Sequence, residues 1–314
     1  MFQKKVEAWP MTAWLAVAVS GPFALIAGRD DWLGVAIAAA ITGALCWAVA
    51  GNPVQRLINS RLYCAVQYIF FIPVLAYFAS QSSAAWPTGS AMPVVPLTLL
   101  SLAAAAACHG AQGASKTCSV LFWLIAGLYG VLLFFGSKDL RISFLQPGYQ
   151  APGSASVLAL LLPAAMQFIP REIKPAHRLA CGLVGAILVI LCLWTVGGLS
   201  ANVAAGMSWP LYEAGKSVSV LGIAERLESF ISVAATVGFF ALYSMLLAAC
   251  GHMAEGIKPG WGKYGVILAG ALVAALVLFA PQIPTVFLLF GALLLWCVVP
   301  FIGGSIFCEK KKKK

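Results

Sequence analysis

The sequence predicts an all-α polytopic membrane protein, folded as a single membrane domain over residues 1–314, with about ten transmembrane helices. Hydrophobic residues make up 61% of the 314 and charged residues only 10%, whereas about a quarter of the residues in a soluble globular chain are charged. Charge-free stretches that are long enough to cross a bilayer recur along the whole chain, and each crossing needs about 20 apolar residues. The mean hydropathy of +0.93 agrees with a chain whose main solvent is lipid.

Five spans are expected in the first half of the chain. Because charged side chains are costly in hydrocarbon, each span is bounded by charged residues or by a polar, Gly or Pro cluster. The charge-free stretch 62–115 is too long for one span, and it divides at Gln81-Ser82-Ser83 and at Trp86-Pro87-Thr88-Gly89 into two helices. The five spans are therefore 8–28, 32–54, two within 62–115, and 117–136.

Five more spans are expected in the second half, at 148–170, at 179–199, within 218–251, at 264–280 and at 284–303. The connection 200–217 carries Trp209, Pro210 and Tyr212, which are typical of an interfacial segment or an outer lid. The basic tail 309–314 follows the last span, and it fits either a solvated stop signal or a contact with anionic lipid.

The placement of Lys and Arg predicts that both termini are cytoplasmic. With the N-terminus inside, fifteen basic residues fall in cytoplasmic segments and four in outer ones, as the positive-inside rule requires. An even number of spans agrees with this topology. The net charge of +10 is thus a topology signal rather than a sign of nucleic-acid binding. The inner set is Lys4, Lys5, Arg56, Arg61, Lys116, Arg171, Lys174, Arg178, Lys258, Lys263 and Lys310 to Lys314, and the outer set is Arg29, Lys138, Arg141 and Lys216.

Two spans carry residues that interrupt helices. Ser20-Gly21-Pro22 in the first span and Leu162-Pro163 in the sixth each lie about two-thirds along their spans. A break would leave backbone carbonyls free near mid-membrane to hold a cation or an ammonium group. Because the two spans open successive groups of five, residues about 8–136 and about 148–303, the pattern predicts a five-plus-five inverted repeat with a central site. Simple packing kinks at Pro22 and Pro163 are the alternative.

The segment Glu225-Arg226-Leu227-Glu228 contains three ionisable residues and lies inside an apolar stretch or at its border. On a helix that starts near Val218, Glu228 would lie about 15 Å deep and could couple to ion or proton movement. Alternatively, 229–251 spans alone and the cluster lies at the outer interface. Both interpretations stay open.

No residue pattern favours an enzyme, a metal site or a bound cofactor. The nine cysteines are scattered without a CxxC pair, as expected of small packing residues. His109, His177 and His252 are all expected in cytoplasmic connections, which argues against a histidine proton relay. No phosphate-binding loop, zinc signature or nucleophile elbow is found in the sequence.

Four stretches of the chain resemble the spore germination permease family, the GerAB-type membrane subunits of germinant receptors in the amino acid-polyamine-organocation superfamily. These are 28–33, with a polar turn before a Trp; 110–116 followed later by 139–147, which ends in Pro; 225–230, with an Arg-x-Glu pattern; and the Lys-rich end. In order and spacing the similarity covers nearly the whole chain. One departure is Leu162-Pro163-Ala164, where many relatives carry a Gly-rich segment with a carboxylate.

The resemblance implies the five-plus-five (LeuT-like) fold with a small-molecule site beside unwound first and sixth helices. It places Ser20, Gly21 and Pro22 in the unwound part of the first helix, and Arg226 and Glu228 in a pair at the start of the eighth. A germinant-sensing or transport subunit that binds a small amino acid is expected, in the bacterial or spore inner membrane. Its partners would be a second membrane subunit and a lipoprotein, with a coupling cation or proton. An autonomous amino acid transporter and a ligand-free membrane scaffold are the alternatives.

Overall fold

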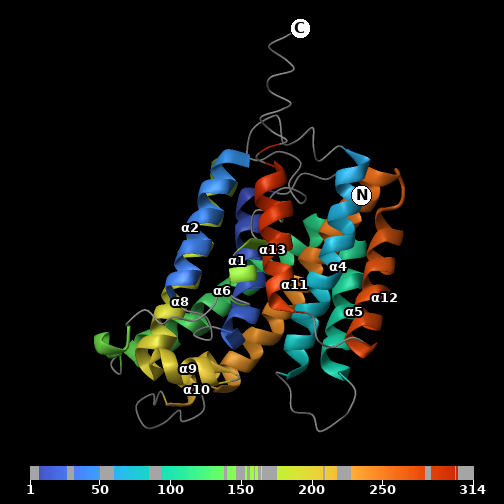
Figure 1. The fold of residues 1–314 in the computed structure, drawn as a ribbon. Helices are drawn as coiled ribbons and strands as arrows, with labels where there is room; N and C mark the ends of the chain where they lie inside the picture. The colour runs from blue at the N-terminus through green and yellow to red at the C-terminus, as the bar shows by residue number, and fades with distance from the viewer. Residues whose placement is uncertain are drawn as a thin grey trace.

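The computed structural model describes residues 7–26, 32–49, 60–84, 93–137, 140–145, 153, 156–158, 160–161, 164, 175–207, 209–217, 228–279, 284–300 and 302. Over these residues all regular secondary structure is helical (Figure 1), which confirms the all-α class. Five of the described helices, α4, α6, α8, α11 and α12, are long and apolar enough to cross a membrane. The chain is therefore a multi-pass membrane protein.

The first-half helices follow the predicted spans closely. They are α1 (Ala8–Ile26), α2 (Trp32–Val49), α4 (Arg61–Ala84), α5 (Val94–Cys108) and α6 (Ala111–Gly136). The predicted division of 62–115 into two helices is confirmed. The helix α4 continues through Ser82 to Ala84, and the Ser82 Oγ donates to the Ala79 carbonyl oxygen at 2.8 Å within the same helix.

The second-half helices are α8 (Pro175–Leu199), α9 (Ala201–Gly206), α10 (Pro210–Ser217), α11 (Glu228–Ile257), α12 (Gly262–Phe279) and α13 (Thr285–Ala292). A short 3-10 helix, η2 (Ile142–Phe144), precedes them, and α13 continues into a π-helix, η3 (Leu293–Val298). Of the predicted sixth span, helical backbone is described at 156–158, 160–161 and 164. The count of ten spans and the inverted repeat remain predictions.

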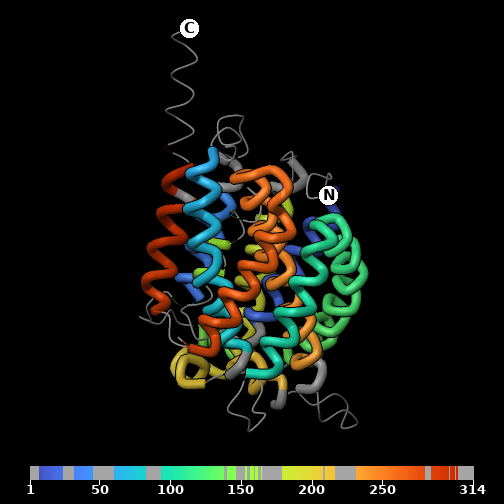
Figure 2. Tube along the Cα trace, turned by 90° about the vertical axis from the view of Figure 1, so that its right-hand side faces the viewer, coloured from blue at the N-terminus to red at the C-terminus, as the bar shows by residue number. Residues whose placement is uncertain are grey.

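The central helix of the bundle is α11, which packs against α1, α4, α5, α6 and α12. Every residue from Ala241 to Cys250 is buried. Two further contacts, α1 with α8 and α2 with α8, extend the bundle on one side. The short helices α9 and α10 lie across one end, and the α11–α12 turn lies at the other end in both views (Figures 1 and 2).

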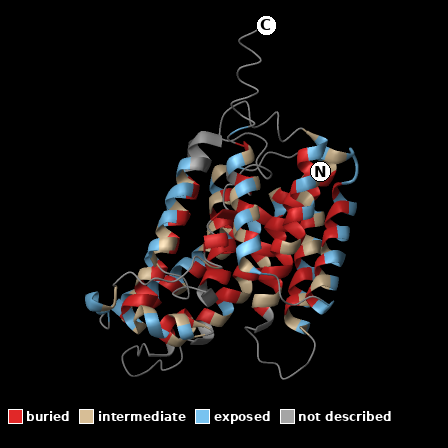
Figure 3. Ribbon diagram, in the orientation of Figure 1, coloured by how far each residue is buried: buried red, intermediate tan, exposed pale blue. Residues whose placement is uncertain are grey.

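The surface of the bundle is apolar, as expected of a protein whose helices face lipid. Figure 3 shows exposed side chains along the outer faces of the helices, while buried ones gather toward the middle. Large exposed apolar side chains include Trp123 and Phe134 on α6, Ile267 on α12 and Phe287 on α13. In water such a surface would aggregate, whereas hydrocarbon solvates it without penalty.

One predicted boundary is wrong in a way that concerns a titratable residue. The eighth helix runs to Ile257 rather than ending near Gly251, so His252 lies inside α11 and not in a connection. Its neighbours Gly251 and Met253 are buried and His252 itself is half-buried. Three residues further on, the Glu255 carboxylate accepts hydrogen bonds from the Gly260 and Gly262 N–H groups, in the turn that follows α11.

Candidate functional site

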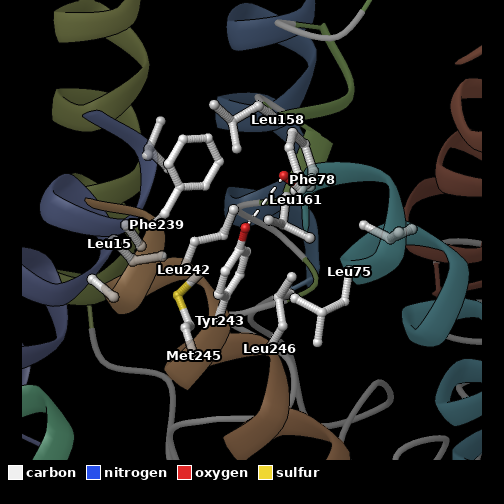
Figure 4. Packing of buried hydrophobic residues seen from close by; sticks show 14 of the residues in the cluster. Leu15, Leu75, Phe78, Leu158, Leu161, Phe239, Leu242, Tyr243, Met245 and Leu246 are labelled. Carbon is white, nitrogen blue, oxygen red and sulfur yellow. Dashed lines mark hydrogen bonds between the residues drawn. The ribbon is translucent and has the colours of Figure 1, made fainter. Parts of the chain in front are cut away.

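The candidate site lies where α1, α4, α11 and the described residues of 156–164 converge on Tyr243. This side chain is fully buried in α11. Figure 4 shows its ring among Leu15 of α1, Leu75 and Phe78 of α4, and Leu158 and Leu161. Four segments that are distant in sequence therefore contribute side chains to one apolar cluster.

The polar part of this site is a pair of hydroxyl groups. The Tyr243 hydroxyl lies 2.7 Å from the Ser82 Oγ and 3.3 Å from the Phe78 carbonyl oxygen, and since the Ser82 hydroxyl donates to the Ala79 carbonyl oxygen, the single Tyr243 proton is shared between these two acceptors. The Ser82 side chain is fully buried. Burying a hydroxyl group is costly unless the group is hydrogen-bonded, and each of these two has a partner. The pair joins α4 to α11 and places two polar oxygens among apolar groups.

The polar residues buried in the described part of the chain carry no formal charge. They are Ser20, Thr42, Gln67, Ser82, Ser115, Ser156, Thr195 and Ser244. Among the same residues, no group of three or more His, Cys, Asp or Glu side chains lies close enough together to hold a metal ion. Hydroxyl groups and helix carbonyls surrounded by apolar side chains suit a guest without net charge.

The predicted break at Ser20-Gly21-Pro22 is wrong: α1 is one α-helix from Ala8 to Ile26, with Pro22 inside it. Close packing supports the helix at this point. A Cβ atom built on Gly21 would lie 2.8 Å from the Ala235 carbonyl oxygen and would overlap Gly238, so the backbones of α1 and α11 touch there. Neighbouring helices allow a proline inside a membrane helix in this way.

The carbonyl of Ser20, which the break was expected to free, already has a side-chain partner. The Tyr129 hydroxyl of α6 donates to the Ser20 carbonyl oxygen at 3.0 Å. The Ser20 Oγ itself donates to the Val17 carbonyl oxygen at 3.0 Å, within the same helix. Ser20, Gly21 and Pro22 thus lie at a three-helix junction of α1, α6 and α11, whose role in binding stays a prediction.

Most of the other predicted site residues lie outside the described part of the chain. These are Leu162, Pro163, Glu225 and Arg226. Glu228 is the first residue of α11, and its backbone alone is described. Ser20–Pro22 lies against α11 at Gly238. Gly238 is ten residues after Glu228 in the same helix.

Sequence reasoning missed the hydrogen-bonding aromatic residues that join the helices. Trp14 of α1 is fully buried, and its Nε1 donates to the Ala241 carbonyl oxygen at 3.1 Å and to the Ser244 Oγ at 3.3 Å. Tyr68 of α4 donates to the Gly265 carbonyl oxygen of α12 at 2.7 Å. The signal in the sequence was a Trp or Tyr well inside an apolar run, because a buried ring of this kind needs an acceptor for its N–H or O–H group.

Comparison with known proteins identifies a family for the chain. No curated protein matches the chain. The model of the family described as spore germination protein, a spore permease family, matches residues 86–258. This stretch is more than half of the 314 residues and holds α5, α6, α8 and α11, including Tyr243. The chain therefore belongs to the spore germination protein family of membrane permeases.

Proposed function

We propose that this chain is the membrane subunit of a germinant receptor, and that it binds a small amino acid with an apolar side chain beside Tyr243. The observation that carries the proposal is the buried Tyr243–Ser82 hydroxyl pair, enclosed by apolar side chains from four segments. The apolar groups favour an apolar side chain on the guest, while hydroxyls and carbonyls satisfy its polar end. The family match supports the germination role.

The five-plus-five inverted repeat is part of this proposal, and the helix pairing supports it. If each of the first five spans corresponds to the span five places later, α4 corresponds to α11 and α5 to α12. A contact of α5 with α11 then requires one of α12 with α4, and both occur. A contact of α4 with α5 requires one of α11 with α12, and both occur as well. In such folds the substrate lies at the repeat interface.

A thermal-shift panel of amino acids on the purified full chain tests the binding proposal. Small apolar amino acids are expected to raise the melting temperature, because a ligand at about 100 times its Kd stabilises the folded state by about 2.7 kcal/mol. Aspartate and lysine are expected to have no effect on the melting temperature. Their side-chain charge would have no buried charged partner among the described residues around Tyr243. The Tyr243→Phe and Ser82→Ala variants are expected to lose the ligand-dependent shift.

The matched control is Tyr68→Phe, which removes a hydroxyl from the same helix bundle at its contact with α12. This variant should keep the ligand-dependent shift even if its own melting temperature falls. A shift that survives in both Tyr243→Phe and Ser82→Ala would place the ligand elsewhere. Arg226→Ala and Glu228→Gln belong in the same panel, and an unchanged ligand response in them would remove both residues from the coupling role.

Two alternative functions give different results in other assays. An autonomous amino acid transporter would support counterflow of a labelled amino acid in liposomes that contain this chain alone, whereas a receptor subunit would need its partner membrane protein and lipoprotein. A ligand-free scaffold would show neither flux nor a thermal shift with any amino acid. We place the protein in the inner membrane with both termini cytoplasmic, since basic residues flank the proposed inner ends of the spans.

A further inference from the structure

The last helix changes its hydrogen-bonding register over Leu293–Val298, where it is a π-helix. Pro300 accounts for the change. In a continuous α-helix the proline ring would collide with the Trp296 carbonyl, four residues earlier, and it has no N–H to offer. Instead, the Val299 N–H bonds to the Leu294 carbonyl, five residues back. The Leu295 carbonyl is then left without a donor in its own helix, because its partner at this spacing is Pro300.

Side chains of α4 supply the missing donor. The Gln67 Nε2 donates to the Leu295 carbonyl oxygen at 2.9 Å, and the Tyr63 hydroxyl reaches the same oxygen at 3.4 Å. The Gln67 amide is held in this orientation because the Trp296 Nε1 donates to its Oε1 at 3.0 Å. Gln67 and Trp296 are both fully buried. A buried amide that bonds a π-helix through both its nitrogen and its oxygen is a specific support rather than a general packing contact.

The helix α13, on the N-terminal side of the π-helix, packs against α4 along one edge. The Phe70 ring occupies the space where Gly291 has no side chain, and the Tyr77 hydroxyl is 3.4 Å from the Thr285 Oγ1. The opposite face of α13 is open, with Val286, Phe287 and Phe290 exposed. A helix that is held on one side and widened at one end has a defined place to bend.

We propose that η3 is a hinge in the last helix, that Gln67 is the latch that fixes the angle of this hinge, and that releasing the latch lets α13 move along α4. On release, Gln67 no longer donates to the Leu295 carbonyl oxygen, while Pro300 still prevents an α-helical register at this point, so the helix bends there. π-Bulges of this kind are frequent at functional sites in helices. This hinge is distinct from the Tyr243 site and does not depend on the ligand proposed there.

Hydrogen exchange of the full chain in lipid nanodiscs, read by mass spectrometry, tests the hinge. In Gln67→Leu, the amides of 285–299 are expected to exchange about tenfold faster, because the Leu295 carbonyl keeps the longer bond from Tyr63 alone and the latch opens. The Gln67 amide bonds to Leu295 and Trp296, which follow α13 in the sequence. If α13 moves as a unit, faster exchange must therefore extend beyond these two residues to 285–292. Tyr68→Phe, one residue along α4, is the control and should leave 285–299 unchanged.

The second variant is Pro300→Ala, which restores an N–H to the last helix. Combined with Gln67→Leu, it is expected to return the exchange of 285–299 to within about twofold of Pro300→Ala alone, since the helix then satisfies its own carbonyls. If Gln67→Leu alone fails to accumulate, the double variant is still expected to accumulate. Additive effects of the two substitutions, unchanged exchange in 285–292, or failure of the double variant to accumulate would each overturn the proposal.

Discussion

At the residue scale, the contact between Gly21 and Gly238 determines how closely α1 and α11 approach. A Cβ atom on either glycine would overlap the backbone of the other helix. In membranes, helices associate through packing and hydrogen bonds rather than through a hydrophobic driving force, so small residues at a crossing are especially valuable. The same crossing keeps α1 helical past Pro22 and positions Trp14 against Ala241.

We expect Gly238→Ala to destabilise the protein by about 1–3 kcal/mol, because the added methyl group forces the two backbones apart. The measurement is thermal or denaturant unfolding of the purified protein. Gly182→Ala on the exposed side of α8 is the control, since nothing lies within 4 Å of a Cβ atom there. It should be neutral or slightly stabilising, and equal effects of the two substitutions would contradict the contact.

At the scale of elements, the turn between α11 and α12 is held by one carboxylate. The Glu255 side chain accepts hydrogen bonds from the Gly260 N–H at 3.1 Å and the Gly262 N–H at 3.0 Å. Gly260 has a φ of +89°, a conformation that suits glycine. The Lys258 ammonium lies 4.6 Å from the centre of the Trp261 ring. These contacts fix the angle at which α12 leaves α11.

Substitution of Glu255 by Gln keeps the length of the side chain but removes its charge and one of its two acceptors. We expect this change to cost about 1–2 kcal/mol and to speed amide exchange in 258–262 specifically. Gly260→Ala is expected to act on the same turn through backbone strain. Exchange in the α5–α6 turn, at His109 and Gly110, is the internal control and should not change. A turn that is unaffected by both substitutions would show that Glu255 is dispensable there.

At the scale of the whole molecule, the turns between helices divide between two ends of the bundle. The α11–α12 turn, with Lys258 and Lys263, lies opposite α9 and α10 (Figures 1 and 2). If both termini are cytoplasmic, the α11–α12 turn and the α5–α6 turn face the cytoplasm, and α9 and α10 face outward.

Short epitope tags inserted in three places test this orientation. Tags after His109 and after Lys258 are expected to bind antibody in inverted vesicles only, and a tag between Met207 and Trp209 in right-side-out vesicles only. Each tagged protein must accumulate to the level of the untagged protein. A tag after His109 or Lys258 that binds on the same side as the tag at 207–209 would contradict the predicted topology.

The sequence by itself determined the fold class, the positions of most spans and the family. The fold class and the spans follow from composition and from apolar runs of membrane-spanning length, which depend on the solvent and not on which helix packs against which, whereas the family follows from the resemblance of four stretches of the chain. Ser20–Pro22 shows the limit of such reasoning. A Gly-Pro pair is compatible with a break or with a kink, and only the contact with Gly238 and the hydrogen bond from Tyr129 decide that α1 stays helical.

The tertiary structure alone decided which polar groups meet. Tyr243 and Ser82 are 161 positions apart, and Gln67 and Trp296 are 229 positions apart. Local sequence cannot specify such pairs, because any buried Tyr, Trp or Gln can form a hydrogen bond with whichever partner the packing of the helices brings within reach. The physical reason is that hydrogen bonding in lipid must be completed between helices, and the arrangement of the helices is a property of the whole bundle.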